Sequence, residues 1–305
     1  MEKTARVPSP LKWHGGKSYL ASRIVAMMPP HTHYVEPFFG GGSVLLAKDP
    51  EGVSEVANDI DRGLANFWAV LRDEDRFKAF VRKCEATPFS EERWKDADDY
   101  FRYQAGFGHP AGCVDHFPED CAYRFFVRCC QSLAGRMDRF APLSRTRTRG
   151  GMNEQASAWL SAVDGLPAVH ARLRRVVVLN RDALDVIRQQ DEPDTLFYCD
   201  PPYLHETRAA ADVYAHEMTI EQHGDLLHLL AHIKGRFLLS GYRSTAYDTH
   251  AETFGWRRTD FDLPNNAAGG AEKRRMVESV WTNFDPAATP EAPAAAGAKA
   301  KRRAG

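Results

Sequence analysis

Five short apolar runs alternate with amphipathic stretches along most of this chain. The runs are typical of strands and lie at residues 34–36, 53–58, 176–179, 195–199 and 236–240. The other stretches have the apolar spacing of helices, at 17–28, from 43, 62–72, from 183 and 219–233. Because the strand runs are continuous rather than alternating, we expect a parallel sheet that helices cover on both faces. The pattern predicts a doubly wound, mostly parallel α/β fold.

Residues 75–172 interrupt this alternation. Their pattern is helical at 75–84, 90–104, 119–134 and 154–172, with Gly, His and Pro in the loops between. We therefore expect segments 8–74 and 173–284 to form one discontinuous domain around a mainly helical insert. Residues 285–305 are mostly Ala, Pro, Gly and Lys, a composition that cannot bury a core and predicts a disordered tail.

Composition and charge exclude several classes of protein. Of 305 residues, 43% are hydrophobic and 27% are charged, and the formal net charge of −1 excludes a globally basic, histone-like protein. No apolar run approaches the roughly 18 residues of a membrane-spanning helix, and the first residues contain no apolar leader. The six cysteines form no C-x-x-C pair, and the histidines have no zinc-finger spacing. We expect a cytoplasmic protein with free thiols and no metal.

A glycine-rich segment, Glu36–Ser43, joins the first strand to a helix. In an open α/β sheet, ligands bind at the carboxyl ends of the strands, and glycines let the backbone approach a ligand closely. The spacing matches neither the G-x-G-x-x-G pattern of dinucleotide sites nor a Walker loop. The segment is therefore either a tight turn or part of a cofactor site that binds no pyrophosphate. Its candidate cofactor contacts are Glu36, Pro37, Phe39, Gly40 and Gly42.

Asp59 favours the cofactor site. It lies 17 residues beyond Gly42, at the end of the second strand run, where a carboxylate can accept hydrogen bonds from both hydroxyls of a ribose. The alternative is that Asp59 or Asp61 caps the helix that begins at Arg62. A cofactor with a ribose but no pyrophosphate indicates S-adenosyl-L-methionine.

The tetrapeptide Asp200–Tyr203 follows an apolar strand directly. Its two prolines remove backbone donors, which leaves the Asp200 carboxylate and the Pro201 carbonyl as acceptors beside the ring of Tyr203. Two acceptors suit the exocyclic amine of a nucleobase, because they hold its N–H bonds and free its lone pair to attack a sulfonium methyl. Tyr203 can stack on a flipped base. The alternative is a proline turn that only ends the strand.

Four motifs, taken in this order, resemble those of the Dam-type, alpha-class N6-adenine DNA methyltransferases: Lys12–Lys17, Glu36–Gly42, Asn58–Asp61 and Asp200–Tyr203. The resemblance extends from about Pro10 to Asn283. It implies a Rossmann-like methyltransferase sheet with a target-recognition insert in the middle of the chain. It also implies S-adenosyl-L-methionine as cofactor and double-stranded DNA as partner. Residues 105–155 differ from the best-known members, which leaves the recognised DNA sequence open.

The resemblance also implies roles for single residues. Trp13 and Lys17 are expected to line the methionine end and the adenine side of the cofactor site. Asp59 is expected to bind the ribose, and Asp182, after a later strand, to contact the adenine of the cofactor. Asp200 is a candidate for both cofactor binding and catalysis, and Pro201 and Tyr203 are the other candidate catalytic residues.

Arginines are concentrated in the insert. Residues 121–151 contain seven arginines, no lysine and one acidic residue. Guanidinium groups suit phosphate oxygens and guanine edges. The candidate DNA contacts are Arg136, Arg139, Arg145, Arg147 and Arg149. The last three would lie on one side of an extended chain. Gln131 and Ser132 are candidate base readers, and a solvated basic loop is the alternative interpretation.

The leading hypothesis is methyl transfer from S-adenosyl-L-methionine to the N6 amine of a flipped adenine in double-stranded DNA. An N4-cytosine methyltransferase stays open, because the same acceptors suit any exocyclic amine. A C5-cytosine enzyme is disfavoured, since it needs a cysteine nucleophile in a loop and Cys129–Cys130 lie in a helical pattern. A catalytically idle DNA-binding homologue is the alternative from another class. We expect a bacterial or phage-encoded, nucleoid-associated monomer or weak dimer.

Overall fold

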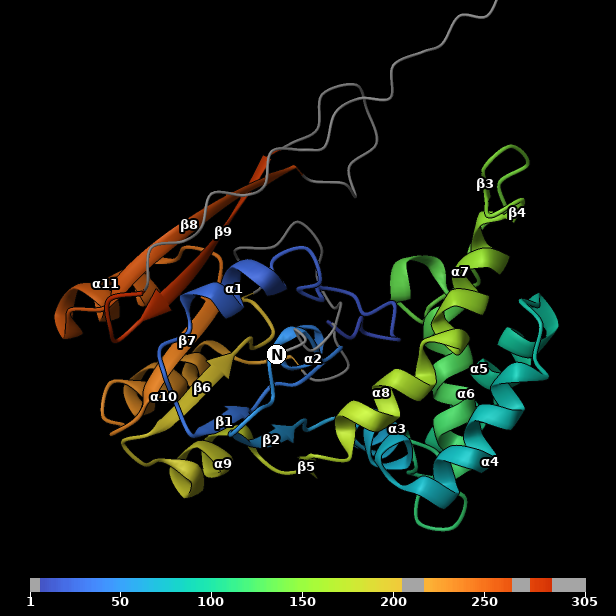
Figure 1. The fold of residues 1–305 in the computed structure, drawn as a ribbon, viewed down its shortest axis with the longest axis horizontal. Coiled ribbons are helices and arrows are strands. Elements are labelled where there is room, and N and C mark those ends of the chain that lie inside the picture. Colours follow the sequence, from blue (N-terminus) through green and yellow to red (C-terminus); the bar gives the residue numbers. More distant parts are fainter. Residues whose placement is uncertain (1–5, 205–216, 265–274, 287–305) are drawn as a thin grey trace, which may run out of the picture.

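A seven-stranded sheet forms the centre of the larger lobe (Figure 1). The computed structural model describes residues 6–204, 217–264 and 275–286, so nearly all of the predicted tail lies outside the described residues. The strands, in sheet order, are β5 (Val176–Leu179), β2 (Ser54–Asn58), β1 (His33–Glu36), β6 (Thr195–Cys199), β7 (Arg236–Gly241), β9 (Arg275–Thr282) and β8 (Arg257–Pro264). The first five are parallel, and β9 and β8 are antiparallel to their neighbours.

Helices cover both faces of this sheet. One face carries α1 (Ala21–Met27), α2 (Ser43–Ala47) and α3 (Arg62–Arg72), and the other carries α9 (Ala183–Gln190), α10 (Ile220–Leu230) and α11 (Thr245–Phe254). Successive strand residues point to opposite faces, so Tyr34 and Leu196 join the first apolar cluster while Val35 and Phe197 join the second. This arrangement confirms the predicted doubly wound α/β fold. None of the described helices is long and apolar enough to cross a membrane.

Both edges of the sheet differ from the sequence prediction. We expected 176–179 to be a buried strand, but β5 lies at an edge and leaves Val177 47% exposed. The antiparallel pair β8 and β9 was not predicted, because β8 carries charged residues at many positions. The pair belongs to the sheet because Phe261 and Trp281 are fully buried in its two apolar clusters.

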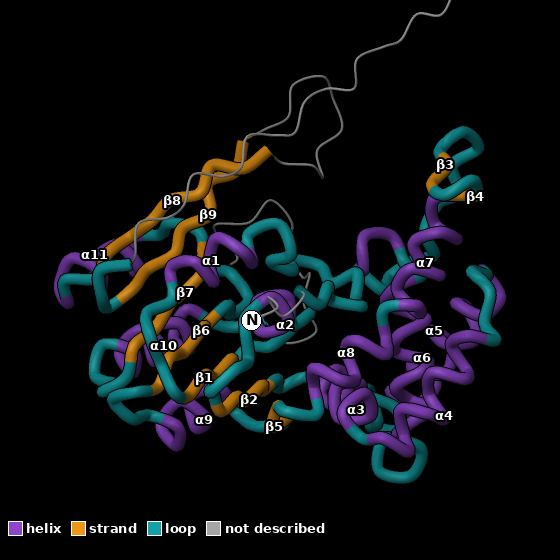
Figure 2. The backbone as a smooth tube through the Cα atoms, in the orientation of Figure 1, coloured by secondary structure: helices purple, strands orange, loops and turns teal. Residues whose placement is uncertain are grey.

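The insert forms a second lobe beside the sheet, as Figure 2 shows. It contains α4 (Glu74–Glu85), α5 (Glu91–Ala105), α6 (Pro118–Cys130), the 3-10 turn η1 (Leu133–Gly135), a hairpin of β3 (Thr148–Arg149) and β4 (Met152–Asn153), α7 (Glu154–Asp164) and α8 (Leu166–Leu173). The helix predicted at 119–134 ends four residues early, and the one predicted at 154–172 is divided at Gly165. Phe67 of α3 stacks on Phe126 of α6 with ring centroids 5.7 Å apart. The insert thus shares its core with the sheet.

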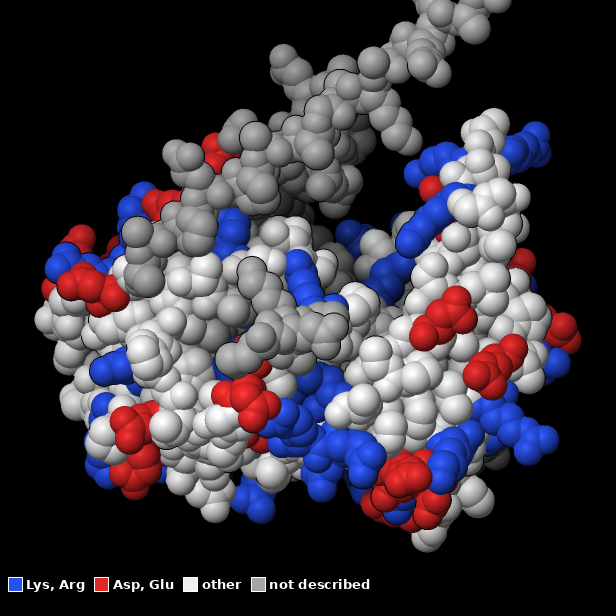
Figure 3. Space-filling model, in the orientation of Figure 1, with Lys and Arg blue, Asp and Glu red and all other residues white. Residues whose placement is uncertain are grey.

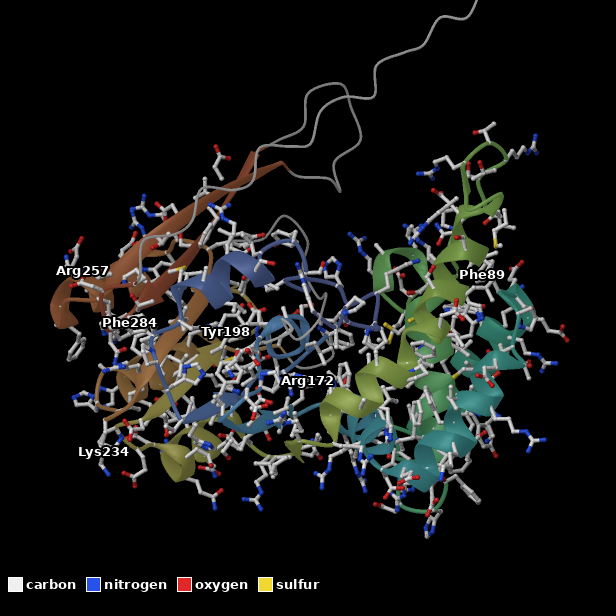
Figure 4. All side chains as sticks on the ribbon, in the orientation of Figure 1. Phe89, Arg172, Tyr198, Lys234, Arg257 and Phe284 are labelled. Carbon is white, nitrogen blue, oxygen red and sulfur yellow. The ribbon has the colours of Figure 1, made fainter. Side chains whose placement is uncertain are left out.

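A buried ion pair also joins the two lobes, and Figure 4 labels its arginine, Arg172. Arg172 of α8 donates to both carboxylate oxygens of Glu55 on β2, at 2.6 and 2.7 Å, and to the carbonyl of Leu45 at 3.0 Å. The side chains of Arg172 and Glu55 are 5% and 0% exposed. Lys48 lies 3.4 Å from the same carboxylate. Because a buried charge without its partner is strongly unfavourable, this pair restricts how the insert lies on the sheet.

We expect Arg172→Ala to lower the free energy of unfolding by about 3–5 kcal/mol, because Glu55 keeps a buried charge without its main partner. The double variant Glu55→Leu/Arg172→Leu is expected to lose less, since it leaves no unpaired charge. Urea denaturation measures both. The matched control is Arg175→Ala, which breaks an exposed pair with Glu51 and is expected to cost about 1 kcal/mol or less. Equal losses for Arg172→Ala and Arg175→Ala would contradict the expectation.

Candidate active site at the carboxyl ends of the strands

The order in which successive strands join the sheet reverses between β1 and β6: β2 and β5 lie on one side and β7 on the other. A cavity of about 690 Å³ opens at the carboxyl ends of β1 and β6. Chain order runs outward from these two strands, which is the position where open α/β sheets bind ligands. The cavity is lined by the glycine-rich loop, by Asp59 and Asp182, and by the start of the Asp200–Tyr203 turn. Phe101, Arg128 and Arg136 of the insert complete its wall. The structure therefore brings the separate sequence motifs to one place.

The glycine-rich loop is shaped by Trp13, which packs directly on it. A Cβ atom on Gly41 would lie 2.6 Å from the Trp13 Cβ, and one on Gly40 would lie 2.9 Å from the Trp13 indole nitrogen. Gly40 and Gly42 also have φ angles of +49° and +66°, which side chains other than glycine rarely adopt. Glycine is needed at Gly40 and Gly41 because the loop backbone packs directly against the side chain of Trp13. Trp13, Pro37, Phe39 and the glycines all line the cavity, as predicted for a cofactor site.

The sequence left open whether Asp59 or Asp61 caps the helix that begins at Arg62, and the structure assigns the cap to Asp61. Asp61 is the helix cap: its carboxylate accepts hydrogen bonds from the backbone of Gly63 and Leu64 at the start of α3. Asp59 instead accepts from the backbone N–H groups of Gly40 and Asp61, both at 2.9 Å, and lines the cavity. Desolvation raises the pKa of the Asp59 carboxyl to about 7, although these N–H groups oppose the shift.

Lys17 lines the cavity, as predicted, but it also makes ion pairs that the sequence did not predict. Its ammonium lies 2.7 Å from both carboxylate oxygens of Asp200 and 3.3 Å from Glu278 on β9. Burial raises the pKa of the Asp200 carboxyl, and the Lys17 ammonium opposes that increase. Burial lowers the pKa of Lys17, but the two carboxylates outweigh this and the pKa is raised overall. Lys17 lines the cavity, yet its charge is bound to the predicted catalytic acid.

Tyr203 lies behind Lys17. Its hydroxyl donates to Glu278 at 2.6 Å, its ring meets Tyr242 edge-on with centroids 4.7 Å apart, and the Lys17 ammonium lies 4.8 Å from the ring centroid. In the part of the chain that the structure describes, Asp200, Pro201 and Pro202 line the cavity and Tyr203 does not. Stacking of Tyr203 on a base therefore stays a prediction.

Asp182 and Glu36 also belong to the lining of the cavity. Asp182 caps α9 by accepting from the backbone of Leu184 and Asp185, and it lines the cavity as predicted for an adenine contact. Glu36 is 1% exposed, and the hydroxyl of Tyr34 donates to it at 2.7 Å. Burial raises the pKa of the Glu36 carboxyl to about 8. Glu36 is therefore largely protonated at neutral pH.

Comparison with known families identifies this arrangement. The model of the D12 class N6 adenine-specific DNA methyltransferases matches residues 13–257, which include all four motifs described above except Lys12, the first residue of the first motif. The chain belongs to this family. The resemblance predicted from the four motifs is thereby confirmed. Among the described residues, no group of three or more His, Cys, Asp or Glu side chains is arranged to hold a metal ion.

Individual relatives of this D12-class protein are distant. The chain is 26% identical over 235 residues to the DNA N-6-adenine-methyltransferase of Escherichia phage P1, covering 75% of this chain and 29% of the phage protein. It is 24% identical over 206 residues to the type II methyltransferase M.MjaIII of Methanocaldococcus jannaschii, covering 63% and 68% of the two chains. It is 26% identical over 196 residues to the DNA adenine methylase of Vibrio cholerae, covering 63% and 64%. The match thus spans under a third of the phage protein and about two thirds of the others.

The insert of this D12-class protein corrects two expectations. Gln131 and Ser132 are fully buried, so they are not base readers: the Gln131 amide donates to the carbonyl of Pro88 and accepts from the backbone of Ser90. The arginines at 145–149 do not form one extended strand, because the Ser144 hydroxyl accepts from the backbone of Thr146 and Arg147 and bends the chain. Local hydrogen bonding therefore replaces the extended geometry that the alternation predicted.

The five candidate arginines are nevertheless all exposed. Arg136 lines the cavity and Arg139 lies three residues further along. Arg145, Arg147 and Arg149 surround the β3–β4 hairpin, where Figure 3 shows a group of basic side chains. Arg147 also pairs with Glu154 at 2.9 Å. The basic side chains thus lie both at the cavity and on the hairpin beyond it.

The sequence missed three residues of this site. Glu278 was not predicted, although a lone acid within the apolar run Val277–Trp281 is unusual for a buried strand. Arg128 lines the cavity, and its Nε donates to the buried Asp98 at 2.7 Å. Phe125 also lines the cavity and lies 6.3 Å from Trp13 between ring centroids. Helix periodicity places Phe125 and Arg128 on α6 but does not show that this helix reaches the cavity.

The raised pKa of Glu36 predicts a pH-dependent effect of Glu36→Gln. The ordinary pKa of 4.5 rises to about 8 on folding, so wild-type stability falls as pH increases between these values. The glutamine side chain does not titrate. We expect the variant to gain stability relative to wild type by roughly 3–5 kcal/mol between pH 5 and pH 9, measured by urea denaturation.

The control is Glu51→Gln, because the Glu51 side chain is 75% exposed. Its stability difference from wild type is expected to be nearly the same at both pH values. A Glu36→Gln difference that does not change with pH would show that Glu36 is ionised in the folded protein across this range.

Proposed function

We propose that the protein transfers a methyl group from S-adenosyl-L-methionine to the N6 amine of an adenine flipped out of double-stranded DNA. The observation that carries the proposal is the meeting of the Asp200–Pro202 turn with the glycine-rich loop and Asp59 in one cavity. The glycine-rich loop and Asp59 suit a cofactor that carries a nucleoside, and the Asp200–Pro202 turn suits an exocyclic amine. Family membership supports the same reaction.

The residues around the cavity fit the proposed cofactor. Asp59 has a carboxylate at the end of β2 that can accept hydrogen bonds from a ribose. Asp182, at the edge of the same cavity, is proposed to contact the adenine. Trp13 and the glycine-rich loop pack against each other, and both line the cavity that would hold the cofactor. When bound, S-adenosyl-L-methionine supplies an electrophilic methyl group on a sulfonium.

Asp200 and the Pro201 carbonyl are proposed to hold the target amine. Both accept hydrogen bonds from its N–H groups, which directs the nitrogen lone pair toward the methyl group. A new N–C bond forms as the S–C bond breaks, which leaves neutral S-adenosyl-homocysteine, and the methylated nitrogen then loses one proton to solvent. The Lys17 ammonium, 2.7 Å from Asp200, favours the ionised form of this carboxylate, which is the form that accepts hydrogen bonds at both oxygens. Tyr203 is proposed to support the flipped base.

The test is methylation of DNA with S-adenosyl-L-methionine labelled in its methyl group, followed by mass spectrometry of the nucleosides. N6-methyladenine is the expected product, and N4-methylcytosine would replace the N6 assignment by the alternative. We expect Asp200→Asn to lower the methylation rate at least about a hundredfold, because the neutral amide oxygen is a weaker acceptor than the carboxylate and no longer pairs with the Lys17 charge. Cofactor binding, measured by calorimetry, is expected to persist in this variant.

Asp185→Asn is the matched control, since the Asp185 side chain is 71% exposed and pairs only with Arg188 at 2.8 Å in the described structure. It should methylate DNA at the wild-type rate. Wild-type turnover by Asp200→Asn would exclude the proposed role of Asp200. Loss of cofactor binding in that variant would instead assign Asp200 to the cofactor site.

A second prediction concerns the hairpin arginines. If Arg145, Arg147 and Arg149 neutralise phosphates, replacing all three with Ala weakens binding to every DNA sequence. The plot of log K against log salt concentration is expected to become shallower by about 0.9 per lost contact, or about 2.7 in total. Fluorescence anisotropy across a salt series measures this slope.

The control replaces Arg188, Arg236 and Arg257, which are exposed on the sheet lobe; Figure 4 shows Arg257 at its far end from the hairpin. This control variant has the same change in net charge and is expected to keep the wild-type slope. If the hairpin variant also keeps the wild-type slope, the hairpin is a solvated loop and DNA binds elsewhere.

A further inference from the structure

Glu278 has no role in the function proposed above, yet it lies at the centre of the polar contacts behind Asp200. It belongs to β9 and is 2% exposed. One carboxylate oxygen accepts from the Tyr203 hydroxyl and the other from the Tyr19 hydroxyl, both at 2.6 Å. The Lys17 ammonium lies 3.3 Å from the first of these oxygens. Glu278 thus contacts side chains from two parts of the chain that are far from β9 in the sequence, the N-terminal segment and the turn after β6.

A carboxylate at this position is not explained by packing. Burying a charge is unfavourable unless hydrogen bonds and an opposite charge compensate, and an apolar residue would fill a strand interior more easily. The neighbouring Val280 and Trp281 of β9 are fully buried apolar residues, as expected for a strand in this sheet. The compensating partners of Glu278 are Lys17, which contacts Asp200, and Tyr203, which ends the turn that Asp200 begins. Its contacts therefore lead to the proposed catalytic turn.

We propose that Glu278 is a positioning residue for methyl transfer: it holds Tyr203 and Lys17 so that Asp200 presents its carboxylate to the cavity. The inference rests on the proposed function. The hydroxyl of Tyr203 donates to Glu278, which fixes the end of the Asp200–Tyr203 turn. Lys17 is attracted by both carboxylates, so its ammonium stays between β9 and Asp200 rather than moving into the cavity.

The charge of Glu278 also acts on Asp200. The titratable groups that interact electrostatically with Asp200 are Lys17, Tyr19, Glu36, Tyr198, Cys199, Tyr203, Tyr247 and Glu278. The negative charge of Glu278 raises the pKa of Asp200, whereas Lys17 lowers it. Replacing Glu278 by a neutral side chain removes this charge and therefore lowers the pKa of Asp200.

The experiment compares Glu278→Gln with wild type in the full chain. We expect kcat to fall at least about tenfold, because small displacements of reacting groups slow a reaction strongly. The KM for DNA and the dissociation constant of S-adenosyl-L-methionine are expected to stay within about twofold, since Glu278 does not line the cavity formed by the described residues. The acidic limb of kcat/KM against pH is expected to move to lower pH.

Tyr203→Phe is the second variant, and it keeps the ring while removing the hydroxyl that donates a hydrogen bond to Glu278. It is expected to lower kcat to a similar degree, and the double variant should be no slower than the slower single variant, because both remove one contact. This variant tests the proposal even if Glu278→Gln does not fold. Ser279→Ala is the control: Ser279 is adjacent on β9, is fully buried and donates to Asp260 at 2.7 Å on the other face.

The Ser279→Ala variant is expected to lose stability without a change in kcat or in the acidic limb. Wild-type kcat in Glu278→Gln or in Tyr203→Phe would overturn the proposal, as would a lower melting temperature as the sole effect of Glu278→Gln. Strictly additive losses in the double variant would also overturn it. A wild-type protein that methylates no DNA would instead overturn the proposed function.

Discussion

One buried ammonium group holds the site together. Lys17 comes from the N-terminal segment, Asp200 from the end of β6 and Glu278 from β9, and the two carboxylates share the single positive charge within 3.3 Å. Opposite charges attract strongly where water is excluded, so these three segments cannot separate without leaving an unpaired charge. The antiparallel extension of the sheet is thereby connected to the turn at the cavity. A substitution in β9 can therefore alter the position of Lys17 and Asp200 even though the substituted residue contacts no ligand.

The N-terminal segment also connects the cavity to the insert. Trp13 packs on Gly40 and Gly41, and the backbone of Lys12 lies so close to Gly135 that a Cβ there would overlap the Lys12 carbonyl oxygen. The Lys12 ammonium donates to Gln155 of α7 at 3.0 Å. Together with the Arg172–Glu55 pair, these contacts give the insert one orientation relative to the sheet. The arginines of the insert consequently have a defined position relative to the cavity.

Much of the fold could be predicted because the apolar periodicities are local properties of the chain. Continuous runs such as Thr195–Cys199 became buried parallel strands, and the helix predicted at 62–72 has those bounds in the structure. The predictions failed where long-range pairing decides the outcome. β5 is at an edge because none of the other described strands pairs with its free side, and the charged β8 is a strand because β9 pairs with it. The bend at Ser144 arose from a side-chain hydrogen bond that alternation does not reveal.

The sequence by itself determined the motifs and their order, and hence the family, because the glycines, Asp59 and the Asp200–Tyr203 turn are short segments with local chemistry. Only the tertiary structure decided that Lys17 binds Asp200, that Tyr203 donates to Glu278, and that Arg128 reaches the cavity. These contacts join residues far apart in the chain. Spacing along one segment carries no information about which distant side chain it will meet, because that depends on how the strands and helices pack.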